Sequence, residues 1–434
     1  MSSIRVCHLC THDILGGAAR ASYRLHTGLL QAGVDSSMLV LSRASDDPTV
    51  RVHTPGRQAL LRLRRANMRR QMAVDSRRAS RRHIKGDPFT DDRSPAGIDL
   101  SRHVAGIQIL NLHWVAGFVD LTWLFSSLEP ATKIVWTLHD QNAMTGGCHY
   151  DGGCDRFTKQ CGACPQLGSD DEHDLSNRIW IRKFKALSHL QTSRVRIVGC
   201  CRWASREASR SGLLSRFQVQ TINYGLDSRL FCPRDRSASR SVLGIPENAR
   251  VLLFVAASID DERKGFSYLR KALEQLSDVP ELLLVSVGAR NVELTSVPRH
   301  LHLGKVESDY LLSIIYSSAD VFVIPSLQEA MAQTALEATA CGTAAVGFDV
   351  GGIPDVIQHG VNGELAQRAD SNSLGLSIGR MLRNLEYSRE MGRRGRQLVE
   401  ERFTLAHQAA NYMKLYEDLL GTRPKLALST AASA

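Results

Sequence analysis

The sequence lacks a long apolar run and an opening typical of a secretory signal. Its first residues, MSSIRVCHLC, do not combine a basic start with a sustained apolar core. No later stretch approaches the ~18 uninterrupted apolar residues that span a bilayer. We therefore expect a cytoplasmic protein, either free or peripheral at the inner face of the cell membrane. The ten cysteines of such a chain predict reduced thiols or metal ligands rather than a disulfide scaffold.

Acidic residues are fewer than basic ones, with 44 Asp and Glu against 54 Lys and Arg, and the formal net charge is +10. This balance suggests an anionic partner, which could be nucleic acid, a phosphorylated substrate or an acidic membrane surface. The 434 residues, 43% of them hydrophobic, suffice for two or three cores and suit two domains. A single small module is therefore excluded.

Apolar runs and helical patterns alternate along the first half of the chain. The opening run IRVCHLC precedes GGAARASYRLHTGLLQAG, whose apolar residues recur at helical spacing and which ends on Gly33. Further strand candidates are SSMLVLS, IQILNLH, KIVWTLHD, VRIVGCC and QVQTINYG, and helical patterns such as RIWIRKFKALSHL and WASREASRSGLL lie between several of them. Strands that alternate with helices predict a parallel sheet with helices on both faces.

The alternation stops at a polar, proline-bearing segment, roughly Asp227 to Arg250, and then restarts. The second half reads strand VLLFVAAS, helix GFSYLRKALEQL, strands ELLLVSVG and LHLGKV, helix DYLLSIIYSSA, and strands VFVIPS and AAVGFDV. We therefore expect an α/β protein with two doubly wound domains. Ligands of such sheets bind beyond the carboxyl ends of the strands, so the expected site is a cleft between the domains.

One segment fits neither domain. Residues Arg57 to Gly86 are dense in arginine, with Asp75 as the only acid and no Phe, Trp or Tyr. Three interpretations are open: a solvated helical insertion or mobile loop, a basic helix lying against anionic lipid, or a nucleic-acid contact. The third is the least favoured, because stacking on bases needs aromatic residues.

Two glutamates, Glu329 and Glu337, lie eight residues apart in SLQEAMAQTALEATACG, directly after VFVIPS. VFVIPS predicts a buried strand and TALEATA a helix that begins near Thr334, so Glu329 is expected in the loop at the carboxyl end of a parallel strand. Backbone N–H groups at the start of that helix would form a phosphate site. Simpler interpretations exist, because Thr334-x-x-Glu337 fits a capping box and Glu329 could be a solvated loop residue.

On these residues the sequence resembles the retaining glycosyltransferases of family 4, which have the GT-B fold of two Rossmann-like domains. The resemblance rests on Glu329-x7-Glu337, the turn ACG and the GG-x-P-[DE] segment from Gly351 to Asp355. It extends to GGAARASYRLHTGLLQAG, TLHD, INYGLD at the domain junction and RKGFSYLRKAL. The cysteine-bearing TGGCHYDGGCDRFTKQCGACPQL resembles a subset of this family that builds bacterial exopolysaccharide and capsule. Colanic-acid-type enzymes belong to that subset.

The resemblance implies a nucleotide-diphosphate sugar as donor. Lys264 would pair with the diphosphate as its bond to the sugar breaks, Glu337 would accept from the ribose hydroxyls, and Glu329 would hold sugar hydroxyls. His139 would hydrogen-bond the sugar near its anomeric carbon, so catalysis is assigned to His139 and Glu329. The alternatives are a solvated surface lysine at 264 and a core histidine satisfied by its neighbours at 139. The expected donor-binding residues are Gly16, Gly17, Arg263, Lys264, Gln333, Thr334 and Glu337.

Two departures from the family pattern concern the diphosphate. Ile259 stands where the family has an arginine, and Arg263 is the candidate to replace it. Ala330 and Ala332 stand where glycine is common, which narrows the space beside the phosphates. No Asp-x-Asp occurs in the chain, and other sugar transferases use that carboxylate pair to hold a divalent ion. We therefore expect catalysis without a metal or other cofactor.

Four cysteines follow TLHD at short intervals. Cys148, Cys154, Cys161 and Cys164 have the spacing C-x5-C-x6-C-x2-C. Four thiolates could hold a structural zinc ion, although only the last pair has a common spacing. Free thiols, disulfides and an iron–sulfur site remain open alternatives. The loop is expected to border the cleft and help to select the acceptor, whereas the C-x2-C of the opening strand is expected in the core.

The expected function is transfer of a sugar, with retention, from a nucleotide-diphosphate sugar to a glycan or lipid-linked acceptor in bacterial surface polysaccharide biosynthesis. One alternative is a soluble GT-B synthase that glycosylates a free sugar or small molecule. Another is a non-catalytic, zinc-stabilised protein that binds glycan or nucleic acid. Residues 1–226 are expected to form an acceptor-side domain, with the basic insertion 57–86 and the cysteine-rich loop 145–167. Residues 227–405 are expected to form a donor-binding domain. Residues 406–421 would form a helix that crosses back to the first domain, and residues 422–434 a flexible tail.

Overall fold

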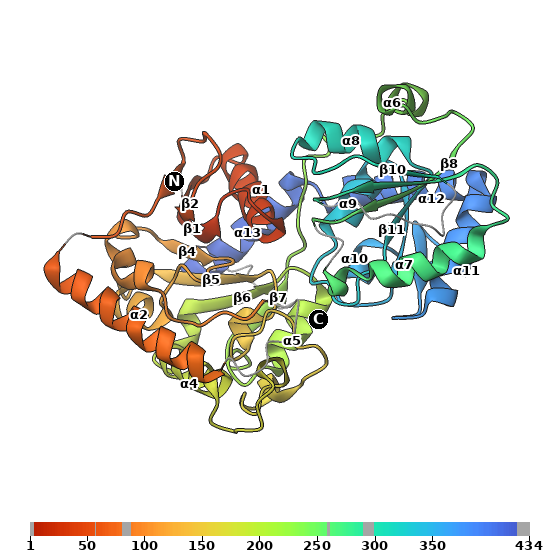
Figure 1. Cartoon of the computed structure of the whole chain (residues 1–434). Coiled ribbons are helices and arrows are strands. Elements are labelled where there is room, and N and C mark those ends of the chain that lie inside the picture. Colours follow the sequence, from red (N-terminus) through yellow and green to blue (C-terminus); the bar gives the residue numbers. More distant parts are fainter. Residues whose placement is uncertain (1–3, 57, 80–87, 258–260, 290–298, 423–434) are drawn as a thin grey trace, which may run out of the picture.

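Two parallel sheets, each flanked by helices, dominate the computed structural model of the chain (Figure 1). The structure describes residues 4–56, 58–79, 88–257, 261–289 and 299–422. Residues 80–86 of the basic insertion, Ile259 and residues 423–434 of the expected tail lie outside this range. Neighbouring strands of both sheets run parallel. The prediction of two doubly wound domains is therefore confirmed.

The first sheet has seven strands in the order β3-β2-β1-β4-β5-β6-β7. Its strands are β1 (Arg5–His12), β2 (Asp35–Ser42), β3 (Val50–Val52), β4 (Ile109–Leu112), β5 (Lys133–Leu138), β6 (Val195–Gly199) and β7 (Gln218–Thr221). The helices of this domain are α1 (Gly17–Gln31), α2 (Ala59–Ala79), α3 (Leu121–Ser127), α4 (Leu175–Ser188) and α5 (Arg202–Arg210). Because β1 and β4 are neighbours, the chain leaves them in opposite directions, which opens a crevice at their carboxyl ends.

The second sheet has six strands in the order β10-β9-β8-β11-β12-β13. Its strands are β8 (Arg250–Val255), β9 (Leu282–Val287), β10 (His300–His302), β11 (Val321–Ile324), β12 (Ala344–Phe348) and β13 (Gly363–Ala366). Its helices are α6 (Arg236–Leu243), α7 (Phe266–Leu273), α8 (Asp309–Ser318), α9 (Gln333–Ala340), α10 (Ile353–Val356), α11 (Ser371–Arg383) and α12 (Leu385–Arg402). The corresponding crevice lies between the carboxyl ends of β8 and β11.

Central strands are buried on both faces, which explains why they read as continuous apolar runs. Every residue of β9, β11 and β12 is buried, as expected for a parallel sheet covered by helices. Cys7 and Cys10 are buried on β1 and contribute to different hydrophobic clusters. Since residues three apart on a strand point to opposite faces, these two thiols are core residues, as the sequence predicts.

The last helix of the chain, α13 (Leu405–Leu420), packs against the first domain beside α1 (Figure 1). Tyr412 and Tyr416 are completely buried there. The hydroxyl of Tyr412 lies 2.8 Å from Oγ1 of Thr137, and the hydroxyl of Tyr416 accepts from Asn111 at 3.1 Å. The chain therefore passes twice between the domains, once before β8 and once before α13.

Helix α2, the described part of the basic insertion, lies along the outer edge of the first domain, away from the second (Figure 1). It is anchored by Arg65, which is buried and donates to two backbone carbonyls, and by Asp75, which pairs with Arg93 at 2.8 Å. Leu60 and Leu63 are exposed to solvent. No helix in the described part of the chain is long and apolar enough to cross a bilayer.

Candidate active site

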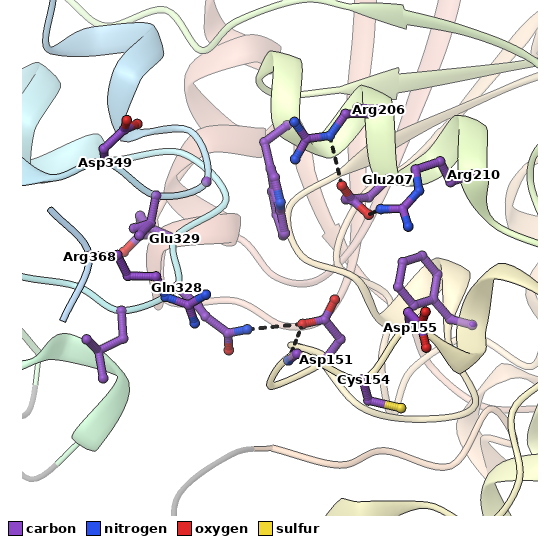
Figure 2. Close-up of a pocket in the computed structure, with 16 residues that line it drawn as sticks. Asp151, Cys154, Asp155, Arg206, Glu207, Arg210, Gln328, Glu329, Asp349 and Arg368 are labelled. Carbon is purple, nitrogen blue, oxygen red and sulfur yellow. Dashed lines mark hydrogen bonds and ion pairs between the residues drawn. The ribbon is translucent and has the colours of Figure 1, made fainter.

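A cavity of about 370 Å³ lies between the two domains at the carboxyl ends of their sheets (Figure 2). From the first domain come helix α5 and the loop that carries Asp151 and Cys154. From the second come the loops after β11, β12 and β13, which carry Glu329, Asp349 and Arg368. The cleft expected from the order of strands is therefore present, and the cysteine-rich loop borders it.

Glu329 and Lys264 form an ion pair on the second-domain side of this cavity. Nζ of Lys264 lies 2.6 Å from Oε2 of Glu329, and the two side chains keep exposed fractions of 25% and 12%. Glu329 lies in the loop after β11, and Lys264 ends the 3-10 turn Glu262–Lys264 that precedes α7. The two residues that the resemblance assigns to the diphosphate and to the sugar are thus in contact, and both retain hydrogen-bonding capacity for a ligand.

Three glycines fix this ion pair in place. Gly265 has a φ of +68°, and a Cβ there would lie 1.8 Å from the carbonyl oxygen that follows β11. A Cβ on Gly351 would lie 1.9 Å from the carbonyl oxygen of Glu329, to which the N–H of Gly352 donates at 3.0 Å. Because only glycine permits such close approach of two backbones, the RKG and GG segments are needed to hold the two loops together.

The N-termini of α1 and α9 meet across the domain interface. Gln333, the first residue of α9, donates from Nε2 to the carbonyl oxygen of Gly17 at 2.7 Å. Gly16, with a φ of +92°, occupies the N-cap of α1, and Thr334 is half-buried beside Gln333. Helix N-termini carry unpaired N–H groups and partial positive charge. An anion placed at this junction would therefore meet two helix ends rather than the single one that the sequence predicts.

Glu337 is buried and bonded to two side chains. Its Oε1 accepts from Nη2 of Arg24 at 2.7 Å, and its Oε2 accepts from the hydroxyl of Tyr316 at 3.0 Å. The capping-box interpretation is wrong, because α9 begins at Gln333, directly after Ala332, and no side chain caps it. The carboxylate that the resemblance assigns to a ribose is thus held by an arginine of the first domain.

The guanidinium of Arg263 is committed to protein groups. It donates to the carbonyl oxygen of Gln328 at 3.1 Å and to Asp261 at 2.9 Å, and its central carbon lies 4.4 Å from the ring centroid of Tyr150. Tyr150 belongs to the first domain, so Arg263 joins the two domains in this arrangement. The candidate to replace the missing arginine is therefore engaged elsewhere.

His139 is buried at the carboxyl end of β5, and both of its ring nitrogens have protein partners. Nδ1 lies 2.5 Å from the hydroxyl of Tyr224, and Nε2 lies 2.9 Å from Nδ1 of His113. His113 continues the chain, with Nε2 at 2.8 Å from Nδ1 of His8. Burial lowers the pKa of His139 to about 4, so the ring is neutral at pH 7. The structure thus has the geometry of a core histidine satisfied by its neighbours, the alternative to a sugar contact.

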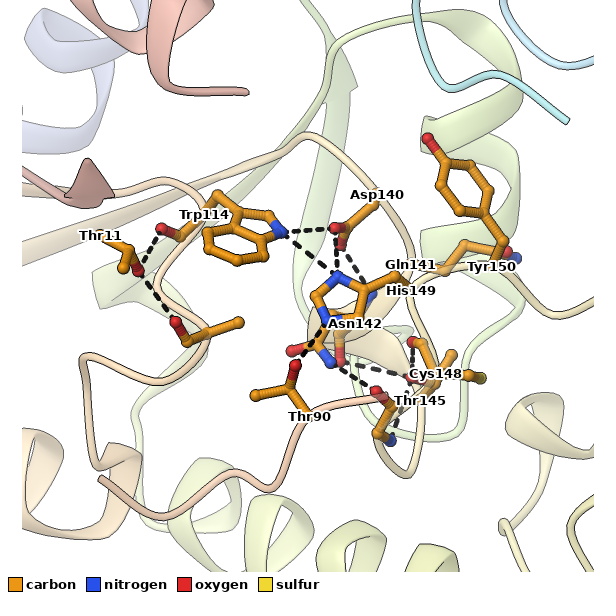
Figure 3. Close-up of polar contacts among 12 residues, drawn as sticks. Thr11, Thr90, Trp114, Asp140, Gln141, Asn142, Thr145, Cys148, His149 and Tyr150 are labelled. Atoms are coloured by element: carbon orange, nitrogen blue, oxygen red, sulfur yellow. Dashed lines mark hydrogen bonds and ion pairs between the residues drawn. The ribbon is translucent and has the colours of Figure 1, made fainter. Parts of the chain in front are cut away.

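The aspartate of TLHD holds the cysteine-rich loop (Figure 3). Oδ2 of Asp140 accepts from Nε1 of Trp114 at 2.7 Å and lies 2.6 Å from Nδ1 of His149. Nε2 of His149 lies 2.9 Å from the hydroxyl of Thr90. Burial alone would raise the pKa of the Asp140 carboxyl, but His149 and the hydrogen bonds hold it below its ordinary value. Both ring nitrogens of His149 therefore have protein partners, and neither is available to a metal ion in this arrangement.

The four cysteines of the loop line one small cavity of about 20 Å³. All four are free thiols, namely Cys148, Cys154, Cys161 and Cys164. Burial raises the pKa of Cys161 to about 11 and also raises those of Cys148 and Cys164. Within the described ranges, no three His, Cys, Asp or Glu side chains are placed to hold a metal ion. The structural zinc therefore stays a prediction.

The site predicted from sequence lacks several first-domain residues that contact the second domain or line the cavity. Gln328 donates from Nε2 to Oδ1 of Asp151 at 3.1 Å across the cavity (Figure 2). Trp203 lines the cavity at the start of α5. Arg24 lies two helical turns after Gly17, and such residues face the same side of a helix. That spacing is the signal that could have identified it.

Comparisons with known proteins agree with this architecture. Residues 235–398 match the profile of the family Glycosyl transferases group 1. N-acetyl-alpha-D-glucosaminyl L-malate synthase of Bacillus anthracis is 28% identical over 46% of this chain and 54% of its own length. D-inositol 3-phosphate glycosyltransferase 2 of Catenulispora acidiphila is 32% identical over 38% of this chain and 42% of its own length. The chain thus spans about half the length of the curated relatives that it matches.

Solved structures extend the likeness to the whole fold. Sucrose-phosphate synthase from Thermosynechococcus elongatus has a TM-score of 0.66 at 19% identity and covers 97% of this chain and 100% of its own. Anabaena HepE in complex with UDP-glucose has a TM-score of 0.64 at 16% identity and covers 95% of this chain and 100% of its own. The fold is therefore GT-B, and residues 235–398 within it match the family Glycosyl transferases group 1.

Proposed function

We propose that this chain is a glycosyltransferase that moves a sugar from a nucleotide-diphosphate sugar to a hydroxyl acceptor in the interdomain cavity. The observation that carries the proposal is the Lys264–Glu329 pair, of which Glu329 lines the cavity at the carboxyl edge of the second sheet. The meeting N-termini of α1 and α9 supply an anion site in the same interface. The match to Glycosyl transferases group 1 over residues 235–398 supports the same conclusion.

Each group has a defined task in this proposal. Lys264 neutralises the diphosphate as the bond between phosphate oxygen and anomeric carbon breaks, because charge then develops on that oxygen. Glu329 accepts hydrogen bonds from the sugar hydroxyls and exchanges part of its contact with Lys264 for them. Donor binding also displaces the contact of Gln333 with Gly17, since the phosphates need the N–H groups of both helices. Glu337 reaches the ribose only if Arg24 shares or releases it.

Retention without a metal ion is the chemistry that we assign to the step. The acceptor hydroxyl attacks the anomeric carbon on the face from which the nucleoside diphosphate leaves. The new C–O bond forms as the old one breaks, and the departing phosphate oxygen takes the hydroxyl proton. No carboxylate needs to act as a nucleophile. The absence of Asp-x-Asp from the sequence supports metal independence, and the proton magnetic resonance spectrum of the product would establish its anomeric configuration.

A glycan or lipid-linked acceptor in surface polysaccharide biosynthesis is the partner that we infer. Helix α2 supports it, because its outer side exposes Leu60, Leu63 and Val74 together with Arg69 and Arg70. Leucines interleaved with arginines suit an anionic membrane surface, which would place the enzyme at the cytoplasmic face of the cell membrane. The similarity of the cysteine-rich loop to exopolysaccharide enzymes points the same way.

A small-molecule acceptor is the second candidate. It is favoured by the names of the curated relatives, which specify L-malate and D-inositol 3-phosphate. In that case α2 would have no role in binding membranes, and free acceptors would be glycosylated without lipid.

A panel of nucleotide-diphosphate sugars tests the proposal. A ligand present at 100 times its Kd stabilises the folded state by about 2.7 kcal/mol, so one or a few members should raise the melting temperature, and these should release nucleoside diphosphate on incubation. Glu329→Ala should abolish the release. If no nucleotide sugar shifts the melting temperature or is turned over, the glycosyltransferase proposal is wrong and a non-catalytic binding protein is favoured.

A further inference from the structure

The acidic residues of the interdomain cavity fall into two groups, and those of the first group are neutralised. Five acidic residues line the cavity. One of the first group, Glu207, lies 3.0 Å from Arg206 and 2.8 Å from Arg210. Glu329 lies 2.6 Å from Lys264. Two acids of the lining and two of its arginines are thus already committed to ion pairs before any ligand enters.

The second group consists of Asp151, Asp155 and Asp349. In the part of the chain that the structure describes, none of these carboxylates forms an ion pair, and Arg368 is the lining arginine without a carboxylate partner. Asp151 and Asp155 are on the first-domain side and Asp349 is on the other (Figure 2). A ligand between them meets three uncompensated carboxylates and one guanidinium.

The partners of Asp151 indicate what such carboxylates accept. Its Oδ1 accepts from Nε2 of Gln328 at 3.1 Å, and its Oδ2 accepts from Nε2 of Gln141 at 2.9 Å. These donors are neutral amides, and sugar hydroxyls are neutral donors that carboxylates accept equally well. A phosphate or carboxylate of an acceptor would instead be repelled by the same oxygens.

Apolar surface accompanies the carboxylates. Trp203 is half-buried and lines the cavity, as do Phe157 and Leu327. An indole face beside hydrogen-bond acceptors suits a sugar ring, which has a face of C–H groups and a rim of hydroxyls. The volume of about 370 Å³ falls within the range of small-molecule sites and accommodates roughly one or two such rings.

We infer that the cavity formed by the cysteine-rich loop, α5 and the loops after β11 and β12 selects an uncharged sugar as acceptor and disfavours an anionic one. The inference rests on the proposed glycosyltransferase function and specifies its acceptor. It distinguishes this chain from its curated relatives, whose names specify malate and inositol 3-phosphate, both anions. Trp203 supplies the stacking face, and Asp151, Asp155 and Asp349 receive the hydroxyls.

Direct binding measurements without a donor test the inference. The probes are two matched pairs, p-nitrophenyl glucoside with p-nitrophenyl glucuronide and the corresponding galactoside with galacturonide, measured by saturation-transfer magnetic resonance and by titration. At least one neutral glycoside should bind ten or more times as tightly as its uronide. Trp203→Ala should weaken that binding tenfold or more. The double variant Asp155→Lys/Asp349→Lys should narrow or reverse the preference, whereas Asp46→Lys, at an exposed site outside the cavity, should not.

Equal or tighter binding of the uronides, or no binding of either member of both pairs, would overturn the inference. So would a preference that the double lysine variant leaves unchanged. Tight binding of a neutral glycoside by a protein that turns over no nucleotide sugar would support the sugar site and overturn the proposed function, so the two failures are distinguishable.

Discussion

Nη2 of Arg24 lies 2.7 Å from Oε1 of Glu337, and this pair joins the first helix of the chain to α9 of the second domain. Both side chains are nearly buried, with exposed fractions of 11% and 6%. Arg24 also lies 3.4 Å from Asp309 and over the ring of Phe231, 5.2 Å from its centroid. A buried pair at this place holds the domains together where the donor is expected to bind.

Arg24→Met should destabilise the protein, because it leaves the Glu337 carboxylate buried without a cation. Loss of one partner of a buried ion pair costs about 3–5 kcal/mol. Arg20→Met is the matched control, because Arg20 is also on α1 but pairs with the more exposed Asp309, the first residue of α8, and such a pair contributes about 1 kcal/mol or less. Urea unfolding measures both. Equal losses in the two variants would contradict a special role for the Arg24–Glu337 pair.

Stability should fall steeply as the pH drops below about 6.5, because four buried histidines cannot take up protons in the folded state. Burial lowers the pKa of His26 and His139 to about 4 and holds those of His8 and His113 well below their ordinary value. The unfolded chain binds these protons near pH 6.5, so the stabilisation is present above that pH and is lost as pH falls toward 4. Each imidazole contributes roughly 1 kcal/mol per pH unit.

Equilibrium unfolding between pH 7.5 and 4.5 measures this dependence. His139→Gln should reduce the slope by the contribution of one imidazole, whereas His173→Gln, at an exposed histidine, should leave it unchanged. A stability that is flat from pH 7 to pH 5 would show that these imidazoles are not held neutral.

The fold was predictable because its signals are local. Apolar runs gave the central strands, and glycine turns marked where helices begin. The edge strands β3 and β13 are short and carry polar residues, so they produced no such run. Of the expected strand LHLGKV, only Leu301 and His302 belong to β10. The candidate site was harder to predict. Glu329 and Lys264 were identified through motifs, but the partners of Glu337 and His139 come from distant parts of the chain.

Arg24 and Tyr316 lie 313 and 21 residues from Glu337 in sequence. No spacing rule links them, so sequence reasoning offered a capping box instead. The same holds for His139, whose partners His113 and Tyr224 are brought to it by strand order and by the linker between domains. Which side chain satisfies a buried polar group depends on tertiary packing, and a single sequence does not specify it.

The cysteine spacing of the loop predicts one zinc ion per chain, although the described structure brings no three of these thiols to a common metal position. Its four thiols line one small cavity, and a bound metal would favour the thiolates that burial otherwise disfavours. Metal content after purification without chelators should approach one zinc in the wild-type protein and in Cys232→Ser, whose thiol lies outside the loop. Cys161→Ser should lose the ion. Wild-type protein free of zinc would contradict the prediction.

Helix α2 should mediate binding to anionic vesicles. Arg69→Glu/Arg70→Glu reverses two exposed charges on its outer side, so the fraction that floats with phosphatidylglycerol vesicles should fall several-fold. Arg270→Glu/Lys271→Glu makes the same charge change on α7 of the second domain and should float like the wild-type protein. If the α2 double variant floats like the wild-type protein, or if the wild-type protein does not float, α2 does not bring the enzyme to its acceptor.

The rate of nucleoside diphosphate release from the nucleotide sugar that binds most tightly tests the central claim most directly. Glu329→Gln and Lys264→Met should each lower kcat/KM by about 100-fold or more, as expected when a group that stabilises developing charge is removed. Glu262→Gln changes an exposed glutamate in the same turn as Lys264 and should stay within about twofold of wild type. Full turnover by the Glu329 and Lys264 variants would show that the chemistry takes place elsewhere.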